Sequence, residues 1–492
     1  MAKVEVVGGV LQVNGSPVGG GGGYDYTLSD GDEIDTVISS PASDIKILIP
    51  ANSTVNVTAG NELGWSTYNN VSFIGEDRDS SILNIVHNGS TVAVDTGTGW
   101  RFNNLTIQGV ATSTGFSAYA LSYLIQASNQ MYYDNCRFTF TATPTGGTHT
   151  QYIFGATTAH EEIFVNNCIY EYPGASASND RLGLCMFENS SSTKNLHIMG
   201  LFINTKGTGI PYTASTQFFI RVREGRSISI NGTHTDQASR IYGTVAAHSS
   251  AYNLGAIYID SDLGGSAPGE GGIQITDCQG IDIGLKETPM AFLSNLSRCS
   301  IHLYDASNAG HGTSSVSNCF AEDIYLQGNT VKLSNISATT TFTIGSAYTQ
   351  ITNCTFSSSV AGTYAVNELY FSNTHFLNTA VTISGNNSQV SNCRFYGAVT
   401  ISGSQNKLSN CYVVTNLSVD GDENTFNGGY IGGVVDFGGT AQGCGLFAAQ
   451  VAGGGGGDSV TNTSNGNHSV GLCRLAGAVN AGGGSIVTTA NY

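Results

Sequence analysis

The chain has 492 residues, enough for a large buried core, and its formal net charge of −17 includes only 18 Lys and Arg. Phosphate contacts need clustered cations, so this charge argues against a nucleic-acid partner. Charged residues make up 11% of the chain and apolar residues 40%, which favours a rigid, β-rich protein over a disordered one. No apolar run is long enough to span a membrane.

The cysteines and the first residues indicate where the chain is made. Eleven Cys is an odd number, and most lie at strand positions. This favours free thiols formed in a reducing cytoplasm over a secreted disulfide framework. The start Met1-Ala2-Lys3 has no charged-then-apolar leader, so we expect no signal peptide.

Residues 1–23 are expected to form an attachment segment. Apolar runs at Val4–Val7 and Val10–Val13, followed by Asn14-Gly15, predict a small β-hairpin element. Gly19–Gly23 predicts a flexible hinge. A disordered tail is the alternative interpretation of this segment.

Residues 24–95 are expected to form an N-terminal β cap, because the first coil of a solenoid exposes an edge that must be covered. The predicted strands are Glu33–Ile38, Asp44–Pro50, Val71–Gly75 and Ser81–Ile85.

From residue 96 to 440 the chain repeats itself. A phrase of Asn, an apolar residue, any residue and a second apolar residue first recurs every 28–32 residues, at Asn104, Asn135, Asn167 and Asn195. Coils of this length must carry excursions of about ten residues, and long loops on a repeat scaffold often bear the binding function.

Between Ser317 and Tyr430 the spacing tightens to 17–20 residues. The phrase Ala-Val-Thr-Ile-Ser-Gly also occurs twice, at 380–385 and at 398–403. A fixed period of this length, with short β-branched runs between Asn, Gly and Ser, predicts the coils of a parallel β-helix. The repeating asparagines are Asn318, Asn335, Asn353, Asn373, Asn392 and Asn410.

The residue types of the repeat have a physical explanation. Asn tolerates the left-handed conformation of a tight corner, and stacked amides can hydrogen-bond from coil to coil. The Cys that often follows is small and apolar, so we expect it to be buried. A disulfide or metal site is the alternative for this column. Coil neighbours lack Cys-x-x-Cys spacing, which favours a stack of packed thiols.

Residues 441–492 change in texture. They contain a second five-glycine run, Gly453–Gly457, and strands of small residues. We expect a C-terminal glycine-rich cap or trimerisation element.

Over roughly residues 65–435 these phrases resemble right-handed parallel β-helices of the pectin-lyase-like type. A leaderless chain of this kind, with a small N-terminal tag and a C-terminal cap, is similar to a bacteriophage tailspike or tail fibre protein. The resemblance implies a homotrimer in the virion, attached to the phage tail or capsid through its N-terminus. It also implies binding of host surface polysaccharide, with or without depolymerase activity. The alternative is a purely structural or adhesive fibre without enzymatic activity.

A glycan hydrolase needs two carboxylates. Asp260 and Asp262 are the candidate catalytic pair, because alternate residues of a strand share a face. The alternative is that an acidic surface produces such pairs by chance. An endo-glycosidase is favoured over a lyase, because cations are scarce and no calcium-loop motif is present.

Substrate contacts are expected from a group of charged and aromatic residues in the same irregular zone. The alternatives are that the arginines are scattered over a β surface and that the tyrosines pack between protomers. We expect no metal site and no cofactor. The candidate substrate-binding residues are Arg223, Asp236, Arg240, Tyr258 and Glu270.

Overall fold

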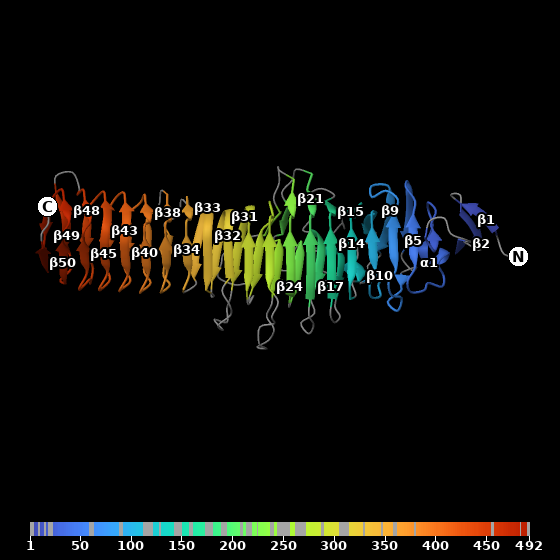
Figure 1. Ribbon diagram of the computed structural model, residues 1–492, viewed down its shortest axis with the longest axis horizontal. Helices are drawn as coiled ribbons and strands as arrows, with labels where there is room; N and C mark the ends of the chain where they lie inside the picture. Colours follow the sequence, from blue (N-terminus) through green and yellow to red (C-terminus); the bar gives the residue numbers. More distant parts are fainter. Residues whose placement is uncertain are drawn as a thin grey trace. The chain divides into compact units, whose positions relative to one another are not determined.

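The computed structural model confirms the β-helix. The chain divides into two compact units, residues 1–288 (unit 1) and 289–492 (unit 2), and the coils of each stack through parallel strands (Figure 1). The structure describes residues 4–7, 10–13, 16–17, 23–58, 63–87, 92–111, 122–126, 129–141, 150–156, 161–172, 181–187, 194–206, 210–212, 219–223, 225–236, 241–243, 256–260, 272–286, 290–304, 314–327, 330–345, 348–357, 362–377, 380–453, 457–482 and 484–489.

The N-terminal strands pair as the sequence predicts. Strands β1 (Val4–Val7), β2 (Val10–Val13) and β3 (Ser16–Pro17) form an antiparallel sheet. The predicted Asn14-Gly15 turn and Gly19 to Gly22 of the hinge lie outside the described residues.

Each coil of unit 1 contributes strands to three faces, which we call first, second and third in chain order. The first face contains β7 (Leu63–Gly64), β10 (Val92–Asp95), β13 (Ser122–Gln126), β16 (Thr150–Ala156), β19 (Arg181–Phe187), β23 (Ile220–Arg223), β27 (Ile257–Asp260) and β29 (Ile283–Lys286). The second contains β4 (Tyr26–Thr27), β5 (Lys46–Ile49), β8 (Ser72–Gly75), β11 (Arg101–Asn103), β14 (Met131–Asp134), β17 (Glu161–Asn166), β20 (Lys194–Met199), β24 (Gly225–Asn231) and β28 (Ile273–Thr276). The third contains β6 (Ser53–Val57), β9 (Ser81–His87), β12 (Thr106–Ala111), β15 (Arg137–Phe140), β18 (Ile169–Glu171), β21 (Phe202–Asn204) and β25 (His234–Thr235). Beside these, β22 (Ile210–Tyr212) pairs with β26 (Ile241–Gly243).

The predicted strand Glu33–Ile38 is wrong, because this segment contains the short helix α1 (Ile34–Val37). Ile34 and Ile38 are both buried, as residues four apart on one face of a helix can be. In a strand Thr36 would lie on the same side as these two isoleucines, but Thr36 is exposed. The other three strands predicted in this region correspond to β5, β8 and β9. Parallel pairing already begins at β4, well before residue 96.

Unit 2 has the same three faces with shorter connections. Its first face contains β36 (Gly362–Tyr364), β39 (Val381–Ile383), β42 (Val399–Ile401), β44 (Leu417–Val419), β46 (Val435–Phe437), β49 (Asp458–Asn462) and β52 (Ala478–Asn480). The second contains β30 (Ala291–Ser294), the first parts of β32 (Ser314–Gln327), β33 (Val331–Gly345), β43 (Lys407–Val413) and β45 (Thr425–Ile431), and β34 (Gln350–Thr352), β37 (Tyr370–Ser372), β40 (Gln389–Ser391), β47 (Gly445–Phe447), β50 (Asn467–Gly471) and β53 (Ser485–Thr489). The third contains the first part of β31 (Ser297–Tyr304), the middle parts of β32 and β33, the last parts of β43 and β45, and β35 (Thr355–Phe356), β38 (His375–Phe376), β41 (Arg394–Phe395), β48 (Gln450–Val451) and β51 (Arg474–Leu475). The last parts of β31, β32 and β33 belong to the first face.

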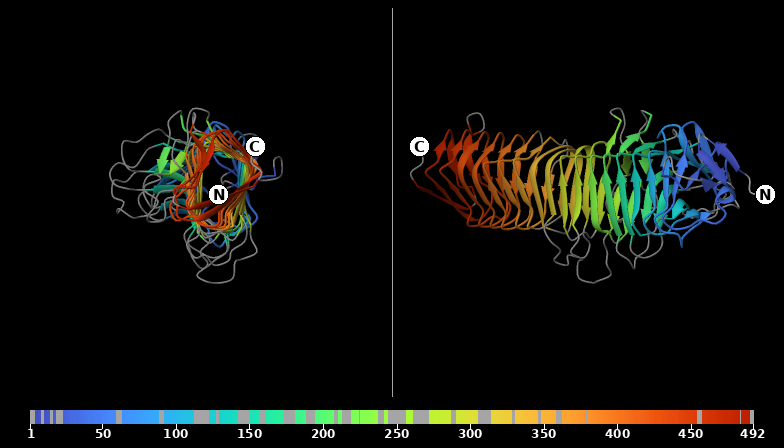
Figure 2. Two further views of the ribbon diagram at one scale, coloured as in Figure 1. Left: turned by 90° about the vertical axis from the view of Figure 1, so that its left-hand side faces the viewer. Right: turned by 45° about the vertical axis from the view of Figure 1, so that its right-hand side comes forward.

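The strand pairing does not change at the predicted boundary between residues 440 and 441. Strands β47 to β53 continue the parallel ladders of the coils before them. In the end-on view of Figure 2 the strands of residues 380–489 lie behind one another. The small-residue strands of 441–492 are therefore further coils, and a capping or trimerisation role for them stays a prediction.

Apolar side chains of successive coils stack inside each unit. In unit 1 the ring of Phe102 lies 5.5 Å from that of Phe73 and 5.1 Å from that of Tyr133, nearly parallel to both. In unit 2 the rings of Phe376 and Phe395 are 4.9 Å apart and also parallel. Successive coils place side chains of the same type at equivalent positions, so the core consists of columns of stacked side chains. Burial of these apolar columns is the main contribution to the stability of the fold.

The corner between the second and third faces confirms the predicted role of asparagine. All six asparagines of the tight repeat have positive φ, between 49° and 55°. Where the column departs from Asn, glycine often replaces it, as at Gly200 and Gly428, also with positive φ. The corner needs a left-handed residue, and Asn and Gly adopt that conformation at least cost.

The predicted amide ladder is present only in part. Asn135 donates to Asn104 at 2.7 Å and Asn335 donates to Asn318 at 3.0 Å, side chain to side chain. From Asn353 to Asn410, among the described residues, the coils are instead joined at this corner by backbone N–H groups, such as that of Asn392, which donates to the carbonyl of Ser409 at 2.9 Å.

The cysteine that follows the corner does two things. All eleven cysteines are free and buried, which confirms the packed-thiol interpretation over disulfides. The thiol also donates to the carbonyl two residues earlier, as Cys393 does to Ser391 at 3.3 Å. That same carbonyl accepts the backbone N–H of Asn373 in the preceding coil at 3.1 Å. At Thr374 a hydroxyl replaces the thiol and donates to Ser372 at 3.0 Å.

The recurring Ser-Gly phrase marks the turn between the first and second faces. A Cβ atom added to Gly385, Gly403 or Gly421 would lie 1.8–2.1 Å from a backbone carbonyl oxygen of the preceding coil. Beside this glycine column, Asn406 and Asn424 are buried and accept backbone N–H groups of the coil before at 2.8 Å. Close approach of the coils thus requires glycine here.

We predict that Gly403→Ala destabilises the protein by about 1–3 kcal/mol, because the added methyl overlaps the carbonyl of Gly385. Ser402→Ala, at an exposed neighbouring position, should change stability by less than about 0.5 kcal/mol. Thermal unfolding of the two variants checks this, and equal midpoints would contradict the close approach.

We predict that Cys354, Cys393 and Cys411 do not react with thiol reagents in the native protein. They are at most 2% exposed, so a reagent cannot reach them, and at Cys354 burial also raises the pKa of the thiol to about 11, which suppresses its reactive thiolate. Labelling followed by mass spectrometry, with and without denaturant, measures this. Rapid native labelling would mean that the Asn-Cys corner faces outward.

Candidate functional site

The predicted catalytic position lies at the end of a first-face strand in unit 1. Asp260 is the last residue of β27, and Asp262 is outside the described residues. Asp260 pairs in register with Arg223 of β23 on one side and with Lys286 of β29 on the other. Three successive coils therefore place the strand positions of an arginine, an aspartate and a lysine side by side at the same edge of one sheet.

The longest connections of unit 1 lead into or out of the first face. Ten residues separate β12 from β13, thirteen separate β26 from β27, and twelve separate β27 from β28, directly after Asp260. Glu270 belongs to the last of these, Arg240 belongs to the short connection between β25 and β26, and both lie outside the described residues. The first face of unit 1 is thus the place where the sequence supplies most material beyond the scaffold.

The predicted contact through Tyr258 is not supported, because this side chain is only 2% exposed. Its neighbours Ile257 and Ile259 are also fully buried, so both sides of this strand are covered. The alternating pattern of the sequence predicts that Tyr258 points away from the core. The pattern cannot show which parts of the chain cover the outer side of this strand. The ring is therefore not open to stack on a sugar.

Asp236 joins its coil to the preceding coil. Its carboxylate accepts hydrogen bonds from the backbone N–H of Thr205 at 3.2 Å and from the hydroxyl of Thr205 at 2.9 Å. Thr205 is one coil earlier and is buried. These hydrogen bonds connect two coils, so Asp236 helps to stabilise the stack.

Sequence reasoning missed a column on the second face of unit 1. Arg101 lies 4.2 Å from the ring centre of Tyr132, and the rings of Tyr132, Phe164 and His197 stack at 4.9 Å intervals. Aligning the coils on the corner asparagines would have revealed it, because Arg101, Tyr132 and Phe164 each lie three residues before one. Because each ring covers the face of the next, the column presents ring edges rather than a flat platform, and it stiffens the second face.

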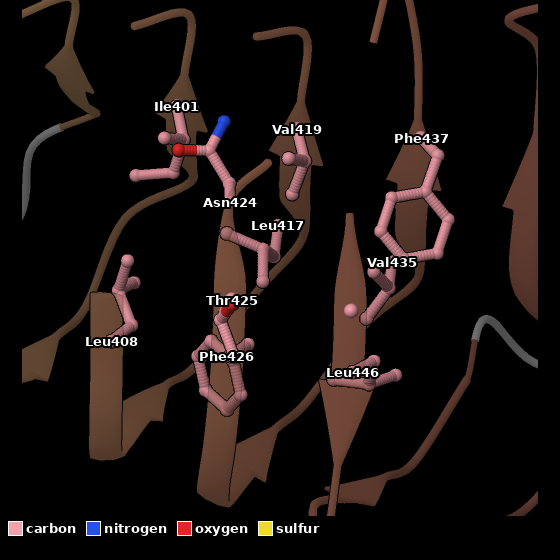
Figure 3. A pocket seen from close by; sticks show the side chains of 11 residues that line it. Ile401, Leu408, Leu417, Val419, Asn424, Thr425, Phe426, Val435, Phe437 and Leu446 are labelled. Atoms are coloured by element: carbon pink, nitrogen blue, oxygen red, sulfur yellow. The ribbon is translucent and has the colours of Figure 1, made fainter. Parts of the chain in front are cut away.

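The pocket in Figure 3 is not a ligand site. It lies in the core of unit 2 between coils and is lined mainly by buried apolar side chains such as Ile401, Leu417 and Phe437. It has two polar lining residues, Asn424 and Thr425, and Asn424 donates to the carbonyls of Gly403 and Gly421 at 2.8 Å. The space is at most large enough for about one water molecule.

A buried Ser–His pair in unit 2 is also not a catalytic site. The hydroxyl oxygen of Ser464 lies 3.0 Å from Nε2 of His468, but the two side chains are 1% and 2% exposed. The His468 ring stacks on Phe437 at 4.4 Å. A substrate cannot reach this pair, and burial lowers the pKa of His468 below its usual value.

Within the described ranges, no group of three or more His, Cys, Asp or Glu is arranged to hold a metal ion. None of the described helices is long and apolar enough to cross a membrane.

Comparison with known proteins identifies no relative at the level of sequence. No family model matches the chain, and no curated protein matches it. Among solved structures, the catalytic unit of a thermostable α-1,3-glucanase from Streptomyces thermodiastaticus strain HF3-3 is similar, with 9% identity, a TM-score of 0.19, and coverage of 94% of this chain and 66% of the other.

Two further solved structures are similar to this chain. Tailspike protein 3 of bacteriophage CBA120 has 7% identity and a TM-score of 0.22 over 85% of this chain and 56% of that chain. The A-module of the mannuronan C-5 epimerase of Azotobacter vinelandii has 11% identity and a TM-score of 0.16 over 94% and 97%. The chain thus spans less than two thirds of the length of the glucanase unit and of the tailspike. Values this low carry no argument about function, which must come from the residues of this chain.

We predict that protonation of His468 destabilises unit 2 in acid. The native state favours the neutral ring, so the unfolded state binds the extra proton below its own pKa of about 6.5, and stability falls as the pH drops through that value. Thermal midpoints of the wild type and of His468→Gln should converge between about pH 7 and pH 5. A constant difference over this range would contradict the prediction.

Proposed function

We propose that the chain is a virion spike or fibre that adsorbs to host cell-surface polysaccharide through the first face of unit 1. The observation that carries the proposal is the register of Arg223, Asp260 and Lys286 at one sheet edge. A sugar chain is bound by polar groups at defined spacings, and the strand positions on adjacent coils of a stack have a fixed spacing. The virion setting rests on the resemblance of the sequence alone.

Hydrolysis at this edge would use two carboxylates. One protonates the oxygen of the leaving sugar, and the other activates a water molecule or attacks the anomeric carbon. Asp260 is one candidate, because its strand position lies in register with Arg223 and Lys286. The acid would then come from a connection that borders the edge, such as the one that contains Asp262.

The alternative function is a structural or adhesive fibre without chemistry. The uniform coils of unit 2 favour it, because they leave little material beyond the strands, with connections of only a few residues between β39 and β46.

A double variant and the wild type together separate the two functions. We predict that Asp260→Asn with Asp262→Asn leaves glycan binding intact and abolishes release of oligosaccharide, because both charges are lost while shape is kept. The measurement is the appearance of new reducing ends from host capsule or O-antigen, with Asp35→Asn in helix α1 as the matched control. Unchanged release would clear the pair of a catalytic role, and no release by the wild type would favour the adhesive fibre.

We further propose that the chain forms a homotrimer attached to the phage tail or capsid through residues 1–23. Closed symmetry is the norm for such assemblies, and the low content of charged residues favours side-by-side packing of coils. Light scattering at micromolar concentration should give about three times the mass of 51.2 kDa. A mass of one chain would contradict this.

A further inference from the structure

The second and third faces of unit 2 carry unpaired cations. Lys332 and Lys407 lie on second-face strands, and Arg394 and Arg474 lie on third-face strands. All four side chains are exposed. Within the described part of unit 2 none of them has an ion-pair partner, whereas Arg137 of unit 1 is paired with Asp79 and Glu171.

The carboxylates of unit 2 lie elsewhere. No strand residue that faces outward on its second or third face is acidic within the described ranges. The described acidic side chains lie on the first face, in the turn that follows it, or just after the third face: Glu322, Asp323, Glu368, Asp420, Asp422, Glu423, Asp436 and Asp458. Unit 2 is thus divided by charge, and the cationic side would attract a negatively charged partner.

Arg394 is held in place by tyrosines. Its guanidinium carbon lies 4.7 Å from the ring centre of Tyr396 and 4.8 Å from that of Tyr412. Tyr412 in turn stacks on Tyr430 at 4.7 Å. Cation–π contact orients the planar fork of the arginine without neutralising it, which leaves its N–H groups free for a carboxylate.

The third face repeats this chemistry along the stack. His375, Arg394, Tyr412, Tyr430, Gln450 and Arg474 pair in register on successive coils. Neighbouring coils are about 4.8 Å apart, so a polymer that lies along the stack meets a hydrogen-bonding side chain at each step. A polymer with regularly placed carboxylates matches this arrangement in both charge and direction.

We propose that these two faces of unit 2 bind an anionic polysaccharide, with Arg394 and Arg474 on its carboxylates and Tyr412, Tyr430 and Gln450 on its hydroxyls. The surface uses no residue of the Asp260 edge, so it holds whether or not unit 1 cleaves glycan. A second copy of the chain is the competing occupant, because its own acidic first face would also be attracted. The regular register of these side chains along the stack favours an extended polymer over a second copy.

Binding of fluorescein-labelled polygalacturonate oligomers, followed by anisotropy, tests the proposal, with dextran oligomers of equal length as the neutral probe. We expect the wild type to bind polygalacturonate, to bind more weakly as salt is added, and not to bind dextran. Arg394→Gln with Arg474→Gln should lower the affinity at least about tenfold. The matched control removes two exposed cations of unit 1, Lys46→Gln with Lys206→Gln, and should change it less than about twofold.

Arg394→Lys keeps the charge and serves as a variant that should fold normally. It should lower affinity by a few-fold, because lysine cannot make the two-pronged contact with a carboxylate. The proposal is overturned if the wild type does not bind polygalacturonate, if dextran binds equally well, or if the control pair weakens binding as much as the arginine pair. A change in mass by light scattering in the arginine variants would also overturn it, since the faces would then be an interface between copies of the chain.

Discussion

The structure depends on one backbone carbonyl in each coil, the one that precedes the left-handed corner. In the tight repeat this carbonyl accepts the corner N–H of the coil before. Where the residue two positions later carries a thiol or hydroxyl, the same carbonyl accepts that group as well. Ser409, for example, accepts from Asn392 at 2.9 Å and from Cys411 at 3.4 Å. A carbonyl oxygen has two lone pairs, and both are used here. The corner therefore joins each coil to the coil before it and ties an interior side chain to the same carbonyl.

The same corner explains why cysteine recurs in a chain without disulfides. The residue after the corner is buried, and at several coils it is a larger apolar residue such as Leu105 or Ile336. Cysteine is also apolar enough for this position and adds a donor near its Cβ, as the threonine hydroxyl does at Thr374. Desolvation by burial keeps the thiol protonated, as the raised pKa of Cys319 to about 11 shows. A protonated thiol can donate a hydrogen bond and is a poor nucleophile. Burial therefore explains both the hydrogen bond at the corner and the low reactivity of the cysteine column.

A rigid stack of this kind separates structure from function. Inward residues are determined by packing, and the outward residue of each strand is free to carry charge or aromatic groups at a fixed spacing. Unit 1 uses this freedom for the Arg223–Asp260–Lys286 register, and unit 2 for the column that includes Arg394 and Tyr412. Both are proposals for glycan contact, but they use different chemistry: an alternation of charges in the first, and a cationic, tyrosine-lined surface in the second.

The sequence by itself determined the repeat, the parallel β-helix, the left-handed asparagine corner and the buried cysteines, because each follows from local residue types at a fixed period. It failed where the period was absent or where contact between coils decided the outcome. The helix at Ile34–Val37 follows from burial of two isoleucines in the first coil. The side chain of Tyr258 is buried although the alternation of the strand predicts that it faces outward. Asp236 accepts a hydrogen bond from Thr205 of a neighbouring coil. The extension of the coils to Thr489 and the division of charge in unit 2 depend on which strands pair. Only the tertiary structure decides these, because stacking joins residues that are a whole coil apart in the chain.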